Sequence, residues 1–288
     1  MRDLGTRNGA RAAAGVRGER RRRRPSLAER ADRYALYERA VQDPGGDVLR
    51  VRRMFERAYG RPPRLLREDF CGTGAFAAAW VRSRGEPRAV AIDLDPEPLA
   101  WGRRHHVSKL RPDQAARLRF VEGDVREVRV PRADVVVAFN FSYFVFATRS
   151  ELLRYFRRAR AGLRRQGVLV IDAYGGPDSM ERREERRRVG GFTYVWDQDR
   201  FDPITHDAIC HIHFEFRDGS RLSRAFSYRW RLWTVPELRD LLGEAGFSGV
   251  TVYWEGTDLA ANEPNGVFRP RKHAEDDPAW IAYLVAER

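Results

Sequence analysis

The sequence contains only two cysteines, two lysines and no long apolar run. Cys71 and Cys210 lie far apart and neither belongs to a Cys-x-x-Cys pair, so a zinc ribbon, an iron–sulfur site and a disulfide scaffold are not expected. The most apolar stretch, residues 135–147, is shorter than the roughly 20 residues that a membrane helix needs. No apolar segment follows the basic N-terminus, which argues against a secretory signal. We therefore expect a cytoplasmic protein without a membrane partner.

Positive charge is concentrated near the N-terminus. The 288 residues carry a formal net charge of +13, and 52 of the 54 basic residues are arginines. Residues 1–30 hold ten arginines against three acids. Because a block of like charges without apolar periodicity does not pack, residues 1–25 are predicted to be a disordered tail. The alternative is an arm that binds nucleic acid through its phosphates.

Residues 26–176 alternate between helical and strand patterns. Ser26, with Glu29 three residues later, has the spacing of a capping box and predicts the first helix; a second helix is expected over 47–59. The alternation that follows predicts a parallel sheet with helical crossovers. The expected strands are 64–68, 89–93, 118–122, 134–139 and 167–172, and the expected helices are 76–83, 96–110 and 150–165.

After Gly175 and Gly176 the pattern changes to an antiparallel meander, with strands expected over 192–197, 208–217 and 221–233. A helix is expected to begin at Thr234, with Pro236 in its first turn, and strands follow at 250–254 and 280–285. We divide the chain into the tail (1–25), an N-terminal helical cap (26–63), a cofactor-binding half (64–176), an inserted antiparallel sheet that serves as an acceptor lid (177–233) and a C-terminal helix with strands (234–288).

The segment 65–76 carries the most specific signal. An apolar strand ends in acids, Gly72 and Gly74 form a Gly-x-Gly turn, and a helix starts at once. The glycines let a ligand lie against bare backbone, and the helix N-terminus contributes free N–H groups. Because the third glycine of the dinucleotide motif is missing, the loop argues against an NAD enzyme.

Two further strands end in acids at a suitable spacing. Asp93 ends its strand 19 residues after Gly74, where a carboxylate accepts hydrogen bonds from ribose hydroxyls. Asp124 follows the end of the next strand, where it can accept a hydrogen bond from an adenine amino group. These acids predict an adenosine-containing cofactor along one edge of the sheet.

Together these features resemble the class I S-adenosylmethionine-dependent methyltransferases, and residues 41–44 with 64–74 look like an uncharacterised bacterial branch of them. The resemblance implies a Rossmann-like α/β fold: a seven-stranded, mostly parallel sheet whose last strand, 280–285, runs antiparallel, with the inserted meander and the N-terminal helices. It implies S-adenosylmethionine as cofactor, bound by Glu68, Cys71, Gly72, Gly74, Asp93, Asp124, Val125 and Asn140. Phe70 stands where the family usually has glycine, and a side chain there is expected to keep φ negative.

The methyl acceptor is less constrained than the cofactor. Asn140 and Tyr143, at the end of the fourth strand, and Trp230, in the meander, are the candidate catalytic residues. Tyr34 and Tyr37 either close over the cofactor or pack in the core. Six aromatic residues of the meander either hold a cationic amine or form a core: Tyr194, Trp196, Phe201, Tyr228, Trp230 and Trp233.

His211, His213 and Glu215 share one strand face, but no further ligand is spaced to complete a metal site, so no metal is expected. We predict N- or O-methylation of a small-molecule acceptor by in-line methyl transfer. One alternative is an RNA or protein methyltransferase that uses the basic arm. The alternative from another class is nucleic-acid binding without catalysis, which a steep salt dependence of binding would reveal.

Overall fold

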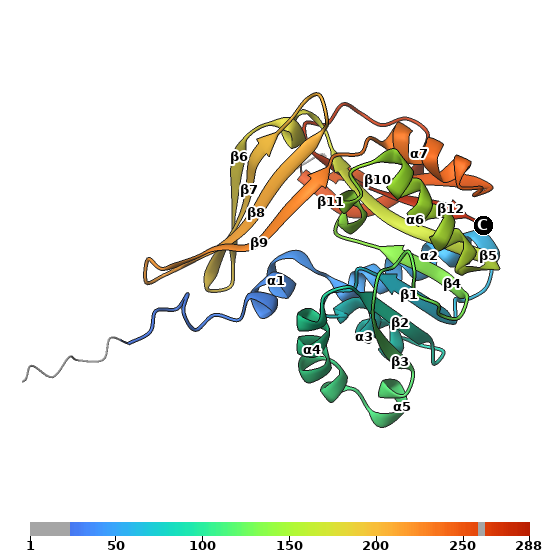
Figure 1. The fold of residues 1–288 in the computed structure, drawn as a ribbon, viewed down its shortest axis with the longest axis horizontal. Coiled ribbons are helices and arrows are strands. Elements are labelled where there is room, and N and C mark those ends of the chain that lie inside the picture. Colours follow the sequence, from blue (N-terminus) through green and yellow to red (C-terminus); the bar gives the residue numbers. More distant parts are fainter. Residues whose placement is uncertain (1–23, 259–262) are drawn as a thin grey trace, which may run out of the picture.

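The computed structural model describes residues 24–258 and 263–288, which form two β-sheets with helices packed around them (Figure 1). Nearly all of the predicted tail, residues 1–23, lies outside the described residues. Within the described ranges, no helix is long and apolar enough to cross a membrane.

The main sheet has eight strands in the order β11-β10-β12-β5-β4-β1-β2-β3. From β3 to β5 all neighbours run parallel, and β12 pairs antiparallel with both β5 and β10. This confirms the predicted mostly parallel sheet with an antiparallel last strand, to which the edge strand β11 is added. The bounds are β1 (Leu65–Asp69), β2 (Arg88–Asp93), β3 (Leu118–Glu122), β4 (Ala133–Ala138), β5 (Leu163–Gly175), β10 (Gly249–Asp258), β11 (Glu263–Arg271) and β12 (Trp280–Glu287).

Helices cover both faces of the main sheet because its central strands are apolar on both sides. On β4, Val135 and Val137 pack with helices α2 (Pro44–Tyr59) and α3 (Ala75–Arg82). Val136 and Ala138, which point the other way, pack with α6 (Arg149–Ala161) and α7 (Val235–Glu244). Two cores therefore hold the strand ends, and the loops that follow them, in fixed positions.

The second sheet has the order β6-β7-β8-β9, and every neighbouring pair is antiparallel. The bounds are β6 (Arg183–Val189), β7 (Phe192–Phe201), β8 (Asp207–Phe216) and β9 (Arg221–Arg231). The meander prediction is confirmed for three strands, whereas β6 was not expected because its sequence is almost entirely charged. Helix α1 (Arg33–Val41) packs on this sheet through Leu36 and Ala40, in a small core with Phe192, Ile212 and Phe214.

Several predicted helix ends were wrong. The bonds between Ser26 and Glu29 exist, but they close a single turn, and α1 starts only after Asp32, whose carboxylate caps the N–H groups of Tyr34 and Ala35. The helix predicted over 150–165 ends at Ala161, because β5 begins two residues later. Helix α4 (Pro96–His105) is shorter than expected. It is followed by the 3₁₀ turn η1 (Val107–Lys109) and by a short helix that was not predicted, α5 (Pro112–Ala115). Two further 3₁₀ turns are η2 (Ser142–Val145) and η3 (Pro177–Met180).

Candidate functional site

The glycine turn lies between the end of β1 and the start of α3. Gly72 and Gly74 have φ values of 53° and 69°, a region that favours glycine. A Cβ at Gly74 would lie 2.3 Å from the Phe120 ring, whereas a Cβ at Gly72 would meet nothing within 4 Å. Gly74 therefore allows close packing of the loop on β3, and Gly72 leaves open space above its backbone. Cys71, between β1 and these glycines, is buried, and this burial is the main cause that raises the pKa of its thiol.

Phe70 adopts φ = 57°, so the expectation that its side chain would keep φ negative was wrong. A non-glycine residue in this region costs about 1–2 kcal/mol. Aromatic contacts offset that cost, because the Phe70 ring lies 5.6 Å from the Tyr155 ring and 5.9 Å from the Phe146 ring, both measured between centroids. The turn thus keeps the left-handed geometry that a glycine would give, with the side chain anchored on α6 and the residue after η2.

Asp93, at the end of β2, lies directly beside the glycine turn. One carboxylate oxygen accepts a hydrogen bond from the Gly72 N–H at 2.6 Å, and the other accepts from the Asp95 N–H at 3.0 Å. The side chain is half-buried, and this burial is the main cause that raises its pKa. The structure therefore brings together the loop and the acid that were predicted to bind the cofactor.

Glu68 has a different position from Asp93. Its carboxylate is buried below the loop and accepts a hydrogen bond from the Ala77 N–H, in the first turn of α3, at 2.9 Å. Burial raises the pKa of Glu68 to about 8, and the neighbouring carboxylates of Asp93 and Asp69 act in the same direction. Glu68 thus fixes the start of α3 from within the core.

Replacing Glu68 by glutamine is expected to stabilise the cofactor-free protein more as pH rises. The ordinary pKa of a glutamate is 4.5, so between pH 4.5 and about 8 the folded protein keeps a proton that the unfolded chain has released. The unfolding free energy contributed by Glu68 therefore falls as pH rises through this window. Glutamine mimics the protonated acid and removes that fall. Thermal melts should show a variant-minus-wild-type difference that grows by at least ~1 kcal/mol between about pH 5 and pH 8.5; a difference independent of pH would contradict the assignment.

Asp124 and Val125 follow β3. Asp124 forms an ion pair with Arg126 at 2.7 Å, and the hydrogen bonds that the Arg126 side chain donates lower the pKa of the Asp124 carboxyl. Val125 is buried, and its carbonyl accepts a hydrogen bond from Arg67 at 2.8 Å. Arg67 is itself buried and paired with Asp69 at 2.6 Å. This buried pair, which the sequence analysis did not identify, ties the predicted adenine end of the site to β1.

Asn140 and Phe141 form the turn after β4, and both have φ = 56°. The carboxylate of Asp172, on β5, accepts hydrogen bonds from both N–H groups, at 2.8 and 2.9 Å. Burial raises the pKa of Asp172 to about 7, although these two bonds lower it. Asp172 therefore holds an otherwise unfavourable turn, whereas the sequence predicts only the strand that contains it.

Helix α1 connects the glycine turn to the second sheet. Glu38 accepts a hydrogen bond from the Thr73 hydroxyl at 2.5 Å and lies 2.6 Å from Nε2 of His106. Tyr34 and Tyr37, on the same helix, contact the Phe226 ring of β9 at centroid distances of 5.9 and 5.0 Å. The helix therefore spans from the predicted cofactor loop to the meander.

Replacing Glu38 by glutamine is expected to weaken cofactor binding by about 1 kcal/mol, because Thr73 and His106 both contact one carboxylate oxygen, and a neutral amide oxygen is a weaker acceptor than that charged oxygen. Calorimetric titration with S-adenosylmethionine measures this. Glu97→Gln is the matched control, since it removes the exposed Arg33–Glu97 ion pair (2.7 Å) between the same helix and α4 and should change the affinity by less than ~0.5 kcal/mol. Equal affinities for the Glu38 variant and the wild type would show that α1 does not support the loop.

A cavity of about 530 Å³ lies between the two sheets, and Tyr174, Trp254 and Trp280 of the main sheet line it. Asn140 and Phe141, in the turn after β4, also line it. Neither the glycine turn nor Asp93 is among its lining residues. Four carboxylate residues line it, Asp178, Glu185, Glu255 and Asp277, and none of its described lining residues is Lys or Arg. Nine aromatic residues also line it: Tyr37, Phe141, Tyr174, Tyr194, Trp196, Tyr228, Trp230, Trp254 and Trp280.

Some of the candidate catalytic and lid residues line the cavity, and the others do not. Trp230 and Asn140 line the cavity, and Trp230 stacks on Tyr228 with ring centroids 4.5 Å apart. Tyr143 is fully buried and donates a hydrogen bond to the carbonyl of Asp172 at 2.7 Å, so it has no surface that an acceptor can contact. Of the six meander aromatics, Trp233 is buried against Phe146 and, like Phe201, does not line the cavity.

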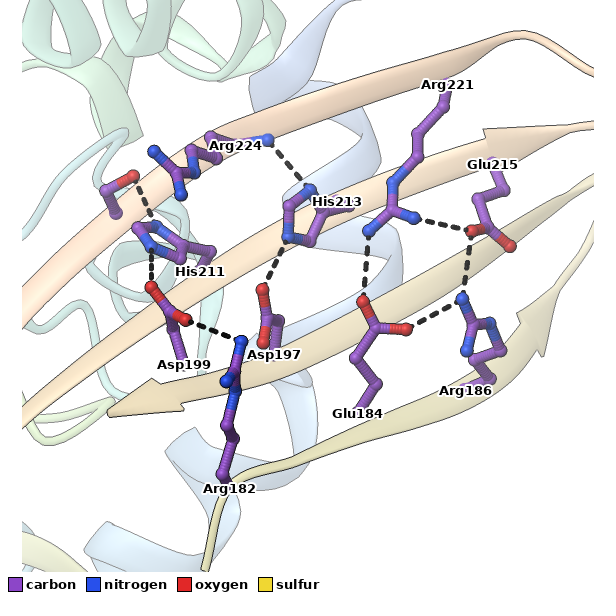
Figure 2. Close-up of polar contacts among 11 residues, drawn as sticks. Arg182, Glu184, Arg186, Asp197, Asp199, His211, His213, Glu215, Arg221 and Arg224 are labelled. Carbon is purple, nitrogen blue, oxygen red and sulfur yellow. Dashed lines mark hydrogen bonds and ion pairs between the residues drawn. The ribbon is translucent and has the colours of Figure 1, made fainter. Parts of the chain in front are cut away.

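Figure 2 shows His211, His213 and Glu215 on one face of the second sheet. Ile212, which alternates with them along β8, lines the cavity, so this face is the one that points away from it. Nε2 of His213 contacts Asp197 at 3.2 Å and Nδ1 accepts the Arg224 N–H, while His211 contacts Ser227 at 2.8 Å and Asp199 at 3.7 Å. Glu215 pairs with Arg186 and Arg221. In the described part of the chain, no group of three or more His, Cys, Asp or Glu residues is arranged to hold a metal ion.

The donors and spaces at this edge fit an adenosine-containing cofactor. The open space over Gly72 admits a ligand against the backbone, and Asp93 offers a carboxylate for ribose hydroxyls. Both lie at the carboxyl ends of parallel strands, where open α/β sheets bind ligands. Of the residues assigned to the cofactor by resemblance, Gly72 and Asp93 are hydrogen-bonded to each other at this edge. Glu68 and Val125 are buried and form hydrogen bonds with Ala77 and Arg67 below it.

Part of the sequence matches a known domain family, and the fold is similar to those of solved structures. Residues 70–167 match the model of a family described as a methyltransferase domain, and no curated protein matches the sequence. A sugar N-methyltransferase from Streptoalloteichus sp. is 21% identical, with 98% of this chain and 99% of that chain covered and a TM-score of 0.61. An amino pentose methyltransferase from Micromonospora echinaspora, solved with S-adenosylmethionine bound, is 17% identical over 88% and 95% of the chains, with a TM-score of 0.62. A Clostridium acetobutylicum S-adenosylmethionine-dependent methyltransferase is 17% identical over 88% and 96%, with a TM-score of 0.61.

Proposed function

We propose that this chain, a class I S-adenosylmethionine-dependent methyltransferase by its fold and its matched domain, methylates the amine nitrogen of a small molecule that binds in the cavity between the two sheets. The observation that carries this proposal is the lining of the cavity, which combines many aromatic faces with carboxylates. Aromatic faces attract cations, by about 0.5–2 kcal/mol for each contact. Such a lining favours a protonated amine and disfavours an anionic acceptor.

The four carboxylates are not equivalent. Asp178 and Glu185 both pair with Arg183, and Glu255 accepts a hydrogen bond from the Gly266 N–H. Asp277 has no hydrogen-bond or ion-pair partner among the described residues. We therefore assign Asp277 as the carboxylate that attracts the ammonium group of the acceptor and takes up the proton that must leave before its nitrogen can react.

The chain's own contribution to methyl transfer is alignment. When bound, S-adenosylmethionine supplies an electrophilic methyl group. Gly72, Gly74 and Asp93 would hold the cofactor, with Asp124, Val125 and Asn140 along the same edge. Asn140 and Phe141, fixed by Asp172, form the boundary between this edge and the cavity. The aromatic walls would exclude water and orient the amine so that its nitrogen lone pair points toward that boundary, where a bound cofactor would present its methyl group.

A screen with isotopically labelled S-adenosylmethionine tests this proposal. The acceptors are small primary and secondary amines, each paired with the alcohol and the carboxylate of matching shape. We expect label on the amine nitrogen and none on the carboxylates; the similar structure described as a sugar N-methyltransferase supports this expectation. Label that enters only hydroxyl groups, bulk RNA or protein would contradict it.

Asp277→Asn is expected to raise KM for the amine found in that screen by about tenfold, because an ion pair with a partly desolvated ammonium is lost. The affinity for S-adenosylmethionine should not change. Asp207→Asn is the control, since Asp207 lies on β8 and forms an exposed ion pair with Arg229 away from the cavity. An unchanged KM in the Asp277 variant would remove this residue from the acceptor site.

A further inference from the structure

A second groove, of about 850 Å³, lies at the amino-terminal edge of the main sheet. Arg64 directly precedes β1, Arg88 starts β2, Arg119 is the second residue of β3 and Arg164 the second of β5. Because these strands run parallel, the groove is at the edge opposite Gly72 and Asp93. Its charged lining consists of five arginines and one acid: Arg64, Arg88, Arg117, Arg119, Arg164 and Glu86.

Two of the arginines are held rigidly in the groove wall. Arg117 donates hydrogen bonds to the carbonyls of Val81 and Pro87, both at 3.0 Å, and pairs with Asp113 at 3.0 Å. Arg164 donates to the buried carboxylate of Asp134 at 3.1 Å. Asp134 also accepts two backbone N–H groups and an Arg61 contact, so its charge is already compensated.

The other three arginines are exposed, and their side chains are unpaired among the described residues. The side chains of Arg64, Arg88 and Arg119 form no hydrogen bond or ion pair with any described residue, although the chain has many acids at its surface. Three unpaired guanidinium groups beside two fixed ones give the groove a strong positive potential. This contrasts with the cavity between the sheets, whose charged lining is acidic.

We propose that this groove is a second ligand site and that it binds a short polyphosphate chain, free or as part of a nucleotide. Guanidinium groups match phosphate oxygens in geometry as well as in charge. The groove volume is that of a small-ligand site. None of its described lining residues is aromatic, so it offers no surface on which the bases of a nucleic acid strand could stack. A small polyphosphate is therefore favoured over a nucleic acid.

Calorimetric titration of the full chain with sodium tripolyphosphate tests the proposal. We expect saturable binding that the double variant Arg88→Ser, Arg119→Ser weakens by at least about tenfold. The matched control is Arg182→Ser, Arg229→Ser, which removes the same charge from two exposed arginines, one just before β6 and one on β9, and should change the affinity by less than roughly twofold. S-adenosylmethionine titrations should be the same for both variants and the wild type, which verifies folding and keeps this test separate from the proposed methyl transfer.

Three results would overturn the proposal. One is the absence of saturable tripolyphosphate binding at about 1 mM. Another is the same result in both double variants. No loss would assign the binding to the N-terminal arginines, which are present in each, and an equal loss would show that the affinity follows net charge and not the groove. The third is binding of a single-stranded oligonucleotide, weakened by the double variant Arg88→Ser, Arg119→Ser, at concentrations where neither tripolyphosphate nor a nucleoside triphosphate binds, which would assign the groove to nucleic acid.

Discussion

Asp93→Ala is expected to reduce the affinity for S-adenosylmethionine by about 3 kcal/mol, or roughly a hundredfold. Hydrogen bonds from hydroxyls to a charged carboxylate contribute about 1.5–3 kcal/mol each, and a ribose offers two of them. The substitution also removes the acceptor for the Gly72 N–H, 2.6 Å from the Asp93 carboxylate, so the glycine turn loses its support from β2. Both effects weaken the binding of S-adenosylmethionine, and the loss of the ribose hydrogen bonds is the larger of the two.

Asp93→Asn separates the charge from the support of the turn, because the amide oxygen can still accept from Gly72, whereas the negative charge and the acceptor for the Asp95 N–H are lost. We expect it to bind S-adenosylmethionine more weakly than the wild type and more tightly than the alanine variant. Asp113→Asn, on the exposed helix α5, is the control that removes one carboxylate away from the site. An alanine variant that binds with wild-type affinity would refute the assignment of Asp93 to the ribose.

Gly102→Ala is expected to destabilise the protein by about 1–3 kcal/mol and to displace the cofactor loop. Gly102 lies within α4, and a Cβ there would be 2.0 Å from the backbone oxygen of Thr73 and 2.8 Å from its carbonyl carbon. The obstacle is backbone rather than a flexible side chain, so either α4 or the Gly72–Gly74 turn must move. Because Thr73 lies between the two glycines, S-adenosylmethionine binding should fall by at least about tenfold.

Gly243→Ala is the matched control for this substitution. Gly243 also lies within a helix, α7, but a Cβ there would meet no atom within 4 Å. Alanine should therefore stabilise α7 by about 0.5–1 kcal/mol, as expected from helix propensity alone. Thermal melts and cofactor titrations of both variants give the comparison. If the two substitutions had the same effect, the close approach of α4 to the loop would not determine the geometry of the site.

The main sheet and the acid-ended strands could be predicted because they follow from local patterns. Alternating strand and helix periods with short connections permit few arrangements, and parallel strands place their carboxyl ends at one edge. The spacing from Gly74 to Asp93 therefore predicted the position of this acid beside the glycine turn, where the structure has it. The confirmed antiparallel last strand came from the family resemblance, since nothing in residues 280–285 themselves gives a direction.

The remaining features depend on contacts between distant residues. Strand β6 is almost entirely charged, and it becomes a strand only because β7 offers a backbone to pair with. The left-handed Phe70 is stabilised by rings on α6 and after η2, which its local sequence does not reveal. Asp172 reads as an ordinary end of a strand, yet it holds the turn of Asn140 and Phe141. The cavity likewise arises where two sheets meet, so its lining cannot be read from either segment alone.

Calorimetric titration of the full chain with S-adenosylmethionine tests the central claim most directly, because it needs no knowledge of the acceptor. The account predicts one saturable site with a dissociation constant of about 1–100 µM, weakened roughly a hundredfold by Asp93→Ala and unchanged by Asp113→Asn. Absence of saturable binding at about 1 mM, or binding that Asp93→Ala leaves intact, would contradict the assignment of this sheet edge as the cofactor site.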